Sequence, residues 1–318
     1  MTAAFTFPGQ GSQSVGMGKA LADAFPVARA VFDEVDAALG ETLSATIWEG
    51  PSETLQLTQN AQPALMAVSL ATLRVLETEA GIDVVRDAAF VAGHSLGEYS
   101  ALAAAGSLSI SDTARLLRIR GLAMQKAVPV GVGAMAALLG LTYETAIEVA
   151  QQAAQGQVCQ VANDNGGGQV VVSGDKAAVE RATEIAKSKG AKRAMLLAVS
   201  APFHCSLMQP AADTMAEALA NVPLASPKVS LVSNVLASAI TAPDEIRNLL
   251  VAQVTGTVRW RESVAFMAQQ GVTHFFEIGS GKVLSGLVKR IADGAVAVAV
   301  GGPGDIAVAK DAIAAARV

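Results

Sequence analysis

The residues with the clearest chemical potential are residues 93–97, which read G-H-S-L-G. This G-x-S-x-G motif lies between a short apolar run, residues 88–92, and a helix-like run, residues 98–105. A tight turn between a strand and a helix needs glycine on both sides and raises the serine hydroxyl above the sheet. The first amides of the following helix then face an oxyanion formed there. We therefore predict that Ser95 is a nucleophile.

A serine nucleophile needs a base, and the chain contains only three histidines. His94 lies on the turn itself and points elsewhere than its neighbour, so we interpret it as a wall residue of the site. His274 begins an apolar strand-like run and is interpreted as structural. His204 lies where the chain passes from one predicted domain to another, and clefts between domains commonly hold small-molecule sites. His204 is therefore our candidate for the general base.

Arg120 lies in a predicted helix that begins near an N-cap at Ser111 and runs to about Ala127. Its neighbours at three and four positions are all apolar: Leu116, Leu117, Ala123 and Met124. A guanidinium held among them needs an anionic partner, whereas a snorkelling side chain keeps its head in water. The pattern leaves open whether Arg120 is buried beside an anion or snorkels to water. A buried Arg120 predicts bidentate binding of a substrate carboxylate.

Two glycine-rich stretches invite comparison with phosphate-binding loops. Residues 8–13 (PGQGSQ) match neither nucleotide-binding pattern, and residues 131–136 (GVGAMA) precede a strand-like run instead of following one. We reject nucleotide binding for both. The loop around Gln10 is better suited to donate a backbone amide to the oxyanion.

Strand-like and helix-like segments alternate along the chain, which predicts a parallel sheet covered by helices. Residues 129–198 follow a different order, β-α-β-β-α-β, which is that of a ferredoxin-like unit. We therefore expect an α/β fold with an α/β-hydrolase-like parallel-sheet core. Its large catalytic domain would be discontinuous (1–128 and 199–318), and the ferredoxin-like domain (129–198) would be inserted into it.

Composition narrows the class of protein. The chain has 318 residues, of which 52% are hydrophobic and 16% charged, as in a compact globular enzyme. The net charge of −5, without a basic run, argues against nucleic acid as a partner. The two cysteines show neither disulfide nor zinc spacing, and no segment resembles a signal peptide or a membrane span. We expect a cytoplasmic monomer without a bound metal and without a membrane association.

Several motifs together resemble the malonyl-CoA:acyl carrier protein transacylases of fatty acid and polyketide synthesis. They occur in the same order over nearly the whole chain: residues 7–13 (FPGQGSQ), 93–98 (GHSLGE), 120–121 (RG), 161–163 (VAN), 202–204 (PFH) and 276–284 (FEIGSGKVL). The resemblance includes the inserted small domain.

The resemblance implies a two-step acyl transfer from malonyl-CoA to the phosphopantetheine thiol of holo acyl carrier protein, without a further cofactor. Ser95, activated by His204, would carry the malonyl group as an ester. The backbone amides of Gln10 and Leu96 would hold the oxyanion, and Arg120 would hold the malonyl carboxylate.

The family orients its histidine through a main-chain carbonyl, here that of Gln253. Together with Arg120, we expect Gln253, Asn163, Phe203 and His94 to form the substrate-binding site. Phe203 occupies a position where relatives that use branched extenders carry a smaller residue. We therefore expect malonyl to be preferred over methylmalonyl.

The principal alternative is a serine thioesterase or esterase of α/β-hydrolase type, which shares the serine motif. That class needs an acid between serine and histidine in chain order, for which Asp112, Asp164 and Asp175 are available. A non-catalytic acyl-binding module would instead bind coenzyme A without a covalent intermediate.

Because acyl carrier protein is acidic, we expect a local basic docking surface. Two clusters are candidates, and the sequence does not choose between them: Lys187, Lys189, Lys192 and Arg193 form one, and Lys282, Lys289 and Arg290 form the other.

Overall fold

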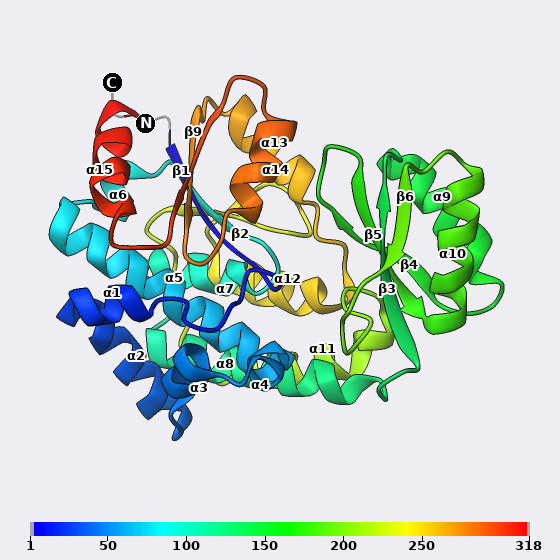
Figure 1. Cartoon of the computed structure of the whole chain (residues 1–318), viewed down its shortest axis with the longest axis horizontal. Helices are drawn as coiled ribbons and strands as arrows, with labels where there is room; N and C mark the ends of the chain where they lie inside the picture. The colour runs from blue at the N-terminus through cyan, green and yellow to red at the C-terminus, as the bar shows by residue number, and fades with distance from the viewer. Residues whose placement is uncertain (1–2, 317–318) are drawn as a thin grey trace.

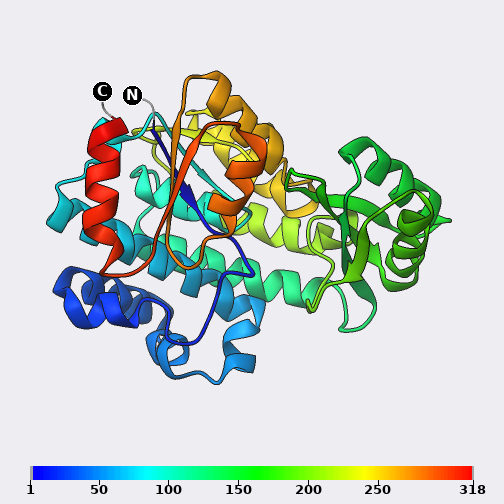
Figure 2. The same cartoon turned by 45° about the horizontal axis from the view of Figure 1, so that its top comes forward.

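The computed structural model describes residues 3–316 and folds into two units of unequal size (Figure 1). The larger unit surrounds a six-stranded sheet, and the smaller unit is built on a separate four-stranded sheet. A second view shows the smaller unit, drawn in green, projecting from one end of the larger one (Figure 2). None of the helices in residues 3–316 combines the length and the apolar composition that a membrane span requires.

The six-stranded sheet is parallel except at one edge. Four pairings, β10–β9, β9–β1, β1–β2 and β2–β7, are parallel, and β7–β8 is antiparallel. The predicted parallel-sheet core is therefore confirmed. In spatial order the strands are β10 (Val296–Val300), β9 (His274–Ile278), β1 (Ala3–Phe7), β2 (Phe90–Gly93), β7 (Ser230–Val232) and β8 (Ala239–Ile240).

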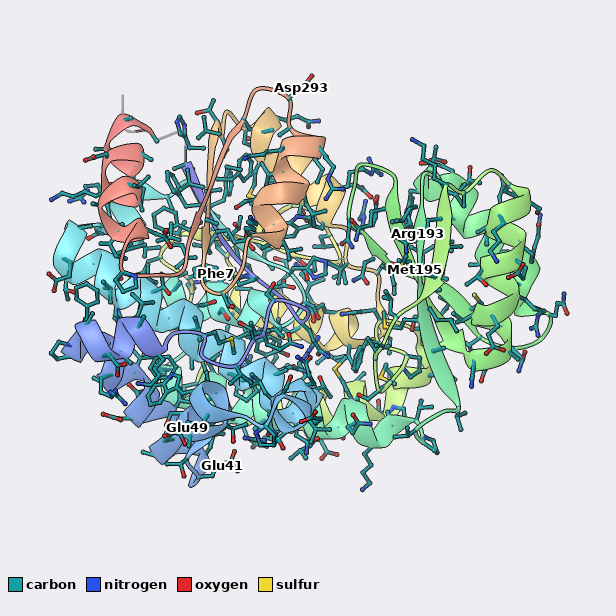
Figure 3. All side chains as sticks on the ribbon, in the orientation of Figure 1. Phe7, Glu41, Glu49, Arg193, Met195 and Asp293 are labelled. Atoms are coloured by element: carbon teal, nitrogen blue, oxygen red, sulfur yellow. The ribbon has the colours of Figure 1, made fainter. Side chains whose placement is uncertain are left out.

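Alternate residues of the central strand β1 face opposite layers of helices, as the twofold period of a strand requires. Phe5 and Phe7 pack into a core shared with the first layer, whereas Ala4 packs with the second. Figure 3 places Phe7 in the middle of the larger unit. The first layer includes α5 (Thr58–Ala80), α7 (Gly97–Ala104) and α8 (Ile110–Ala127), and the second includes α13 (Trp260–Gln269) and α14 (Val283–Ile291).

Further helices complete the larger unit: α1 (Lys19–Ala24), α2 (Pro26–Leu39), α3 (Leu43–Glu49), α4 (Ser52–Gln56), α6 (Val84–Asp87), η1 (Ser206–Met208), α11 (Gln209–Ala220), α12 (Pro243–Thr255) and α15 (Asp305–Ala316). One detail differs from the sequence expectation. The N-cap of α8 is Ser109 and not Ser111, because the Ser109 side chain accepts the Asp112 amide. Helix α8 consequently begins at Ile110.

The smaller unit has the predicted β-α-β-β-α-β order. Its strands pair antiparallel in the spatial order β4-β5-β3-β6, and helices α9 and α10 pack against them. The elements are β3 (Gly133–Leu139), α9 (Tyr143–Ala154), β4 (Cys159–Asp164), β5 (Gln169–Asp175), α10 (Lys176–Ser188) and β6 (Arg193–Leu196). Figure 3 labels Arg193 and Met195 on β6. The chain boundaries at 129 and 198 stay a prediction.

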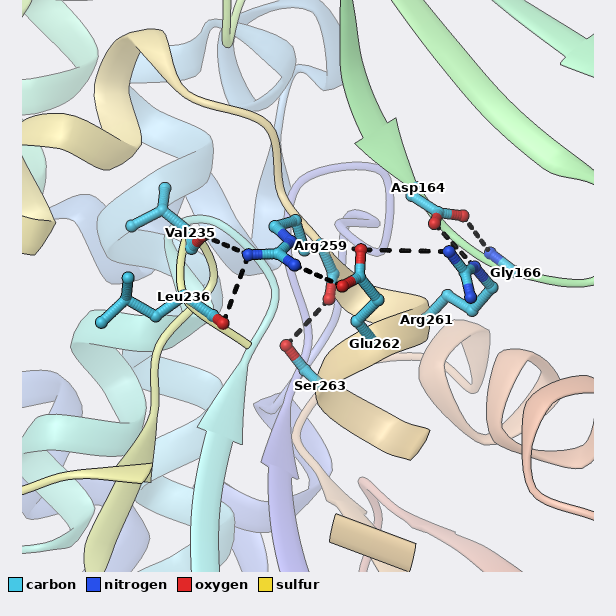
Figure 4. Close-up of polar contacts among 8 residues, drawn as sticks. All are labelled: Asp164, Gly166, Val235, Leu236, Arg259, Arg261, Glu262 and Ser263. Carbon is cyan, nitrogen blue, oxygen red and sulfur yellow. Dashed lines mark hydrogen bonds and ion pairs between the residues drawn. The ribbon is translucent and has the colours of Figure 1, made fainter. Parts of the chain in front are cut away.

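The two units are joined by backbone pairing and by an ion pair. The Asp164 amide donates to the Val258 carbonyl, and the Val258 amide donates to Ala162. The Arg261 guanidinium, at the start of α13, contacts the buried Asp164 carboxylate at 2.7 Å (Figure 4). Beside it, Arg259 donates to the Val235 carbonyl, in the loop that follows β7. The end of β4 is thus fixed to the segment between α12 and α13.

The turn between β2 and α7 lies against the end of β1 with no space for side chains at its two glycines. A Cβ at Gly93 would lie 1.9 Å from the Gly97 carbonyl oxygen, and one at Gly97 would lie 2.2 Å from the Phe7 carbonyl oxygen. Between them, Ser95 adopts a φ of 53°, a left-handed conformation that a non-glycine residue rarely adopts. Close approach of backbones therefore maintains the strained serine.

Replacing Gly97 by alanine should destabilise the protein, because the new methyl group meets main-chain atoms that cannot move independently. We expect Gly97→Ala to lower the free energy of unfolding by at least about 2 kcal/mol. Gly286→Ala in α14 is the matched control, since nothing lies within 4 Å of its Cβ position. This control should gain roughly 0.5–1 kcal/mol from helix propensity. Urea unfolding of both variants measures the difference, and equal effects would contradict the close-approach argument.

Candidate active site

A cavity of about 600 Å³ opens where the two units meet. Residues from both units line it, and they include eight of the nine residues predicted from the sequence: Gln10, His94, Ser95, Leu96, Arg120, Asn163, Phe203 and His204. The ninth, Gln253, is fully buried and lies outside this lining. Gln253 contacts Arg120, Glu98 and His204 instead of lining the cavity, and its part in substrate binding stays a prediction.

Ser95 and His204 form the hydrogen-bonded pair that nucleophilic catalysis requires. The Ser95 hydroxyl lies 2.8 Å from Nε2 of His204. The other ring nitrogen, Nδ1, lies 2.9 Å from the main-chain carbonyl oxygen of Gln253. A carbonyl only accepts hydrogen bonds, so it holds the proton on Nδ1 and leaves Nε2 free to accept the serine proton. The geometry is that of a nucleophile, a base and an orienting group.

The electrostatic surroundings keep His204 neutral. Burial, followed by the nearby positive charge of Arg120, lowers the pKa of His204 to about 3, although the hydrogen bond to Gln253 opposes this shift. The ring is therefore unprotonated at neutral pH and ready to act as a base. His204 also has a positive φ of 59°, so both members of the pair hold strained backbone conformations.

The Arg120 side chain is 1% exposed, and its guanidinium reaches the nucleophile. It donates to the Ser95 hydroxyl at 3.1 Å and to the side-chain oxygens of Gln62 at 2.7 Å and Gln253 at 2.8 Å. Its Nε–H has no hydrogen-bond partner among the described residues. Burial lowers the pKa of Arg120, and the neighbouring Tyr99 and Glu98 partly offset this effect. Of the two interpretations left open by the sequence, the structure thus excludes a snorkelling arginine.

Two backbone amides are positioned to stabilise negative charge beside Ser95. Leu96 follows the nucleophile and is the N-cap of α7, and Gln10 lies in the loop after β1. Both line the cavity, and neither N–H donates a hydrogen bond to another of residues 3–316. The Gln10 loop is held in place by its side-chain oxygen, which accepts the Thr58 hydroxyl at 2.9 Å. Free amides of this kind can stabilise an oxyanion, and the assignment of these two to an oxyanion hole stays a prediction.

The remaining predicted residues form the walls of the cavity. His94 contacts the Asn165 side chain through Nε2 at 2.9 Å and packs against Trp260, and burial lowers its pKa. Asn163 lies at an irregularity in the pairing of β4 with β5, which turns this residue toward the large unit. Phe203 is largely buried directly beside the base.

Three polar residues of the site were missed by the sequence analysis: Gln62, Glu98 and Asn234. Gln62 links Arg120 to the oxyanion loop, because its side chain also bonds Thr58. Asn234 accepts the Ser95 amide at 2.7 Å and donates to the Gly93 carbonyl at 2.7 Å, which braces the turn. Two signals were available: Gln62 directly precedes an apolar run of α5, residues 63–68, and Glu98 directly follows the G-x-S-x-G motif.

No carboxylate among residues 3–316 hydrogen-bonds the His204 ring. Of the acids considered for a hydrolase triad, Asp112 bonds Ser109 and Arg115 at the start of α8, Asp164 pairs with Arg261, and Asp175 accepts the Val158 amide. The described residues also contain no group of three or more His, Cys, Asp or Glu side chains that could hold a metal ion. The arrangement can perform acyl transfer through a serine ester.

Comparisons with known proteins point the same way. Residues 4–302 match the family model described as acyl transferase domain. The chain is 48% identical to the malonyl CoA-acyl carrier protein transacylase of Escherichia coli (strain K12), over 97% of this chain and 98% of the relative.

Among solved structures, an acyl-carrier-protein-S-malonyltransferase from Bartonella henselae is 57% identical, with a TM-score of 0.96 over 99% of this chain and 100% of that one. A malonyl-transacylase solved in complex with a type II PKS acyl-carrier protein is 44% identical, with a TM-score of 0.94 over 98% of this chain and 100% of that one. The predicted resemblance is confirmed, and the chain belongs to the family of malonyl CoA-acyl carrier protein transacylases, which share the acyl transferase domain.

Proposed function

We propose that the protein transfers the malonyl group of malonyl-CoA to the phosphopantetheine thiol of holo acyl carrier protein. The observation that carries the proposal is the buried Arg120 guanidinium, which lies 3.1 Å from the Ser95 hydroxyl and has an unpaired Nε–H. In a malonyl ester of Ser95, a single methylene separates the carboxylate from the ester carbonyl. A cation beside the nucleophile is therefore within reach of that carboxylate and pairs with it.

In the first step, Ser95 attacks the thioester carbonyl while Nε2 of His204 takes the hydroxyl proton. The carbonyl electrons move onto the oxygen, where the amides of Gln10 and Leu96 receive them, each contributing about 3 kcal/mol. The tetrahedral intermediate then collapses with loss of the coenzyme A sulfur, to which His204 returns the proton. The products are a malonyl-Ser95 ester and free coenzyme A.

In the second step, the carrier-protein thiol gives its proton to His204 and attacks the ester, and Ser95 leaves with that proton. The leaving group of the first step and the acceptor of the second are both thiols, so the two steps are close to energetic balance. Water must be kept from the ester between them. The position of Ser95 in a cavity between two units serves this exclusion.

The proposed partner is an acidic carrier protein, and the two basic clusters stay candidates for its docking surface. In the first cluster, Lys187 pairs with Glu184 and Lys189 pairs with Glu148. These ion pairs neutralise part of that surface, whereas Lys282 and Lys289 have no ion-pair partner among the described residues.

The malonyl-Ser95 ester is directly observable. Intact-protein mass spectrometry after brief incubation with malonyl-CoA should show a malonyl-sized adduct, and Ser95→Ala should show none. Holo acyl carrier protein should remove the adduct and become malonylated. Accumulation of free malonate in place of carrier-protein malonylation would indicate a thioesterase and contradict the proposal.

Removal of the Arg120 guanidinium should abolish the preference for malonyl over acetyl groups, which lack the carboxylate. We expect Arg120→Ala to reduce malonyl transfer by two to three orders of magnitude, which corresponds to roughly 3–4 kcal/mol, while acetyl transfer changes far less. Arg118→Ala on the same helix is the matched control, because Arg118 pairs with Glu41 outside the cavity. Rates of enzyme acylation from malonyl-CoA and acetyl-CoA measure the effect. Unchanged malonyl transfer in Arg120→Ala would refute the assigned contact.

Phe203 should limit the size of the acyl group. Replacement by serine opens space beside His204, so Phe203→Ser should raise the methylmalonyl-to-malonyl ratio of kcat/KM by about 10–200-fold. Competition between the two thioesters, followed by mass spectrometry of the acyl carrier protein, measures this ratio. An unchanged ratio would show that the ring does not contact the α-substituent.

A further inference from the structure

Glu98 is a buried carboxylate to which the mechanism above gives no role. It lies in the first turn of α7, three residues after the nucleophile, and is 1% exposed. Its Oε2 accepts the Gln253 side-chain amide at 2.6 Å. The carbonyl oxygen of the same side chain accepts Arg120 at 2.8 Å. A single amide group thus bridges a buried anion and a buried cation.

The charges around Glu98 are few. Arg120 faces it from α8, and Tyr99, with a pKa raised to about 12 mainly by burial, neighbours it on α7. The loop after β7 and helix α12 contribute only neutral groups, from Asn234 and Gln253. Burial raises the pKa of Glu98 to about 7, although these hydrogen bonds and the Arg120 charge oppose the shift. Above this pKa, Glu98 and Arg120 therefore compensate each other's charge in the unliganded enzyme.

From this geometry, and resting on the proposed function, we infer that Glu98 is the resident counterion of Arg120 and takes up one proton when the malonyl carboxylate binds there. Without that proton, the buried cluster would hold two anions and one cation. With it, the cluster is neutral before and after binding, which avoids the cost of burying a net charge. Glu98 is in this sense a positioning and specificity-determining residue.

The proton is compatible with the contact between Glu98 and the Gln253 side chain. A neutral carboxyl group keeps a carbonyl oxygen that can accept the Gln253 amide. The orientation of the Gln253 side chain, and with it the contact to Arg120, is preserved. When the malonyl carboxylate replaces ionised Glu98 as the negative charge near Arg120, the guanidinium stays in place.

The inference has a defined pH dependence. Below the pKa of Glu98 the carboxyl is already protonated, and malonyl binding needs no further proton. Above it, each pH unit should weaken malonyl binding by up to about tenfold, because a proton must be recovered from solution. An acetyl group carries no carboxylate, so its binding should lack this dependence.

Calorimetric titration of Ser95→Ala protein, which binds thioesters without turnover, tests the proton uptake. Malonyl-CoA and acetyl-CoA are titrated at pH 8 in two buffers of different ionisation enthalpy. We expect malonyl-CoA to take up close to one proton more than acetyl-CoA. The phosphates of coenzyme A titrate equally in both ligands and cancel in this difference. An equal proton count for both ligands would overturn the inference.

Variants test whether Glu98 is the residue that takes up the proton. In the Ser95→Ala background, Glu98→Gln should abolish the difference between the ligands. Glu277→Gln should retain the difference in proton count. The Glu277 carboxylate is equally buried, but it lies on β9 and accepts the Leu284 and Ser285 amides at the start of α14. Persistence of the difference in Glu98→Gln would overturn the assignment. If Glu98→Gln fails to fold, the two-ligand comparison in Ser95→Ala alone still decides whether a proton is taken up.

A kinetic measurement on the active enzyme separates this role from a merely structural one. The malonyl-to-acetyl ratio for acylation of Ser95 should fall by up to about tenfold per pH unit above pH 7, and should be flat in Glu98→Gln. A uniform loss of kcat at every pH would indicate a structural role and overturn the inference. Failure of the proposed function is distinguishable, because malonyl-CoA would then neither bind Ser95→Ala nor form a malonyl-enzyme.

Discussion

The constraint on which the site depends is the burial of the Arg120 guanidinium beside the nucleophile. A cation without water needs hydrogen-bond partners and a compensating charge nearby. Helix α5 supplies Gln62, α12 supplies Gln253, the turn after β2 supplies Ser95, and α7 supplies the charge of Glu98. One buried charge therefore fixes four chain segments relative to one another.

Gln253 connects this cluster to the smaller unit. Its side chain bonds Arg120 and Glu98, and its main-chain carbonyl orients His204. The chain that follows it runs directly into the segment that pairs with β4 and ends at the ion pair of Arg261 with Asp164. The position of the smaller unit is thus coupled to the base by a few residues of continuous backbone.

Local patterns were sufficient to predict the alternation of elements, the serine turn and the apolar surroundings of Arg120. These features depend on residues within a few positions of each other. The contacts of Glu98 and Asn234 could not be predicted, because they join segments more than a hundred residues apart. The cap of α8 was misplaced since two nearby serines compete for one role, and only the structure shows that Ser109 accepts the Asp112 amide.

The use of a main-chain carbonyl to orient His204 follows from the same buried charge. A carboxylate on Nδ1 would lie within the field of Arg120 and compete with the malonyl group for it. A carbonyl fixes the tautomer through the same hydrogen bond but brings no charge. The acid of the cluster, Glu98, instead bonds the Gln253 side-chain amide and makes no hydrogen bond to the His204 ring. Separating the orienting group from the counterion thus leaves the cation available to the substrate.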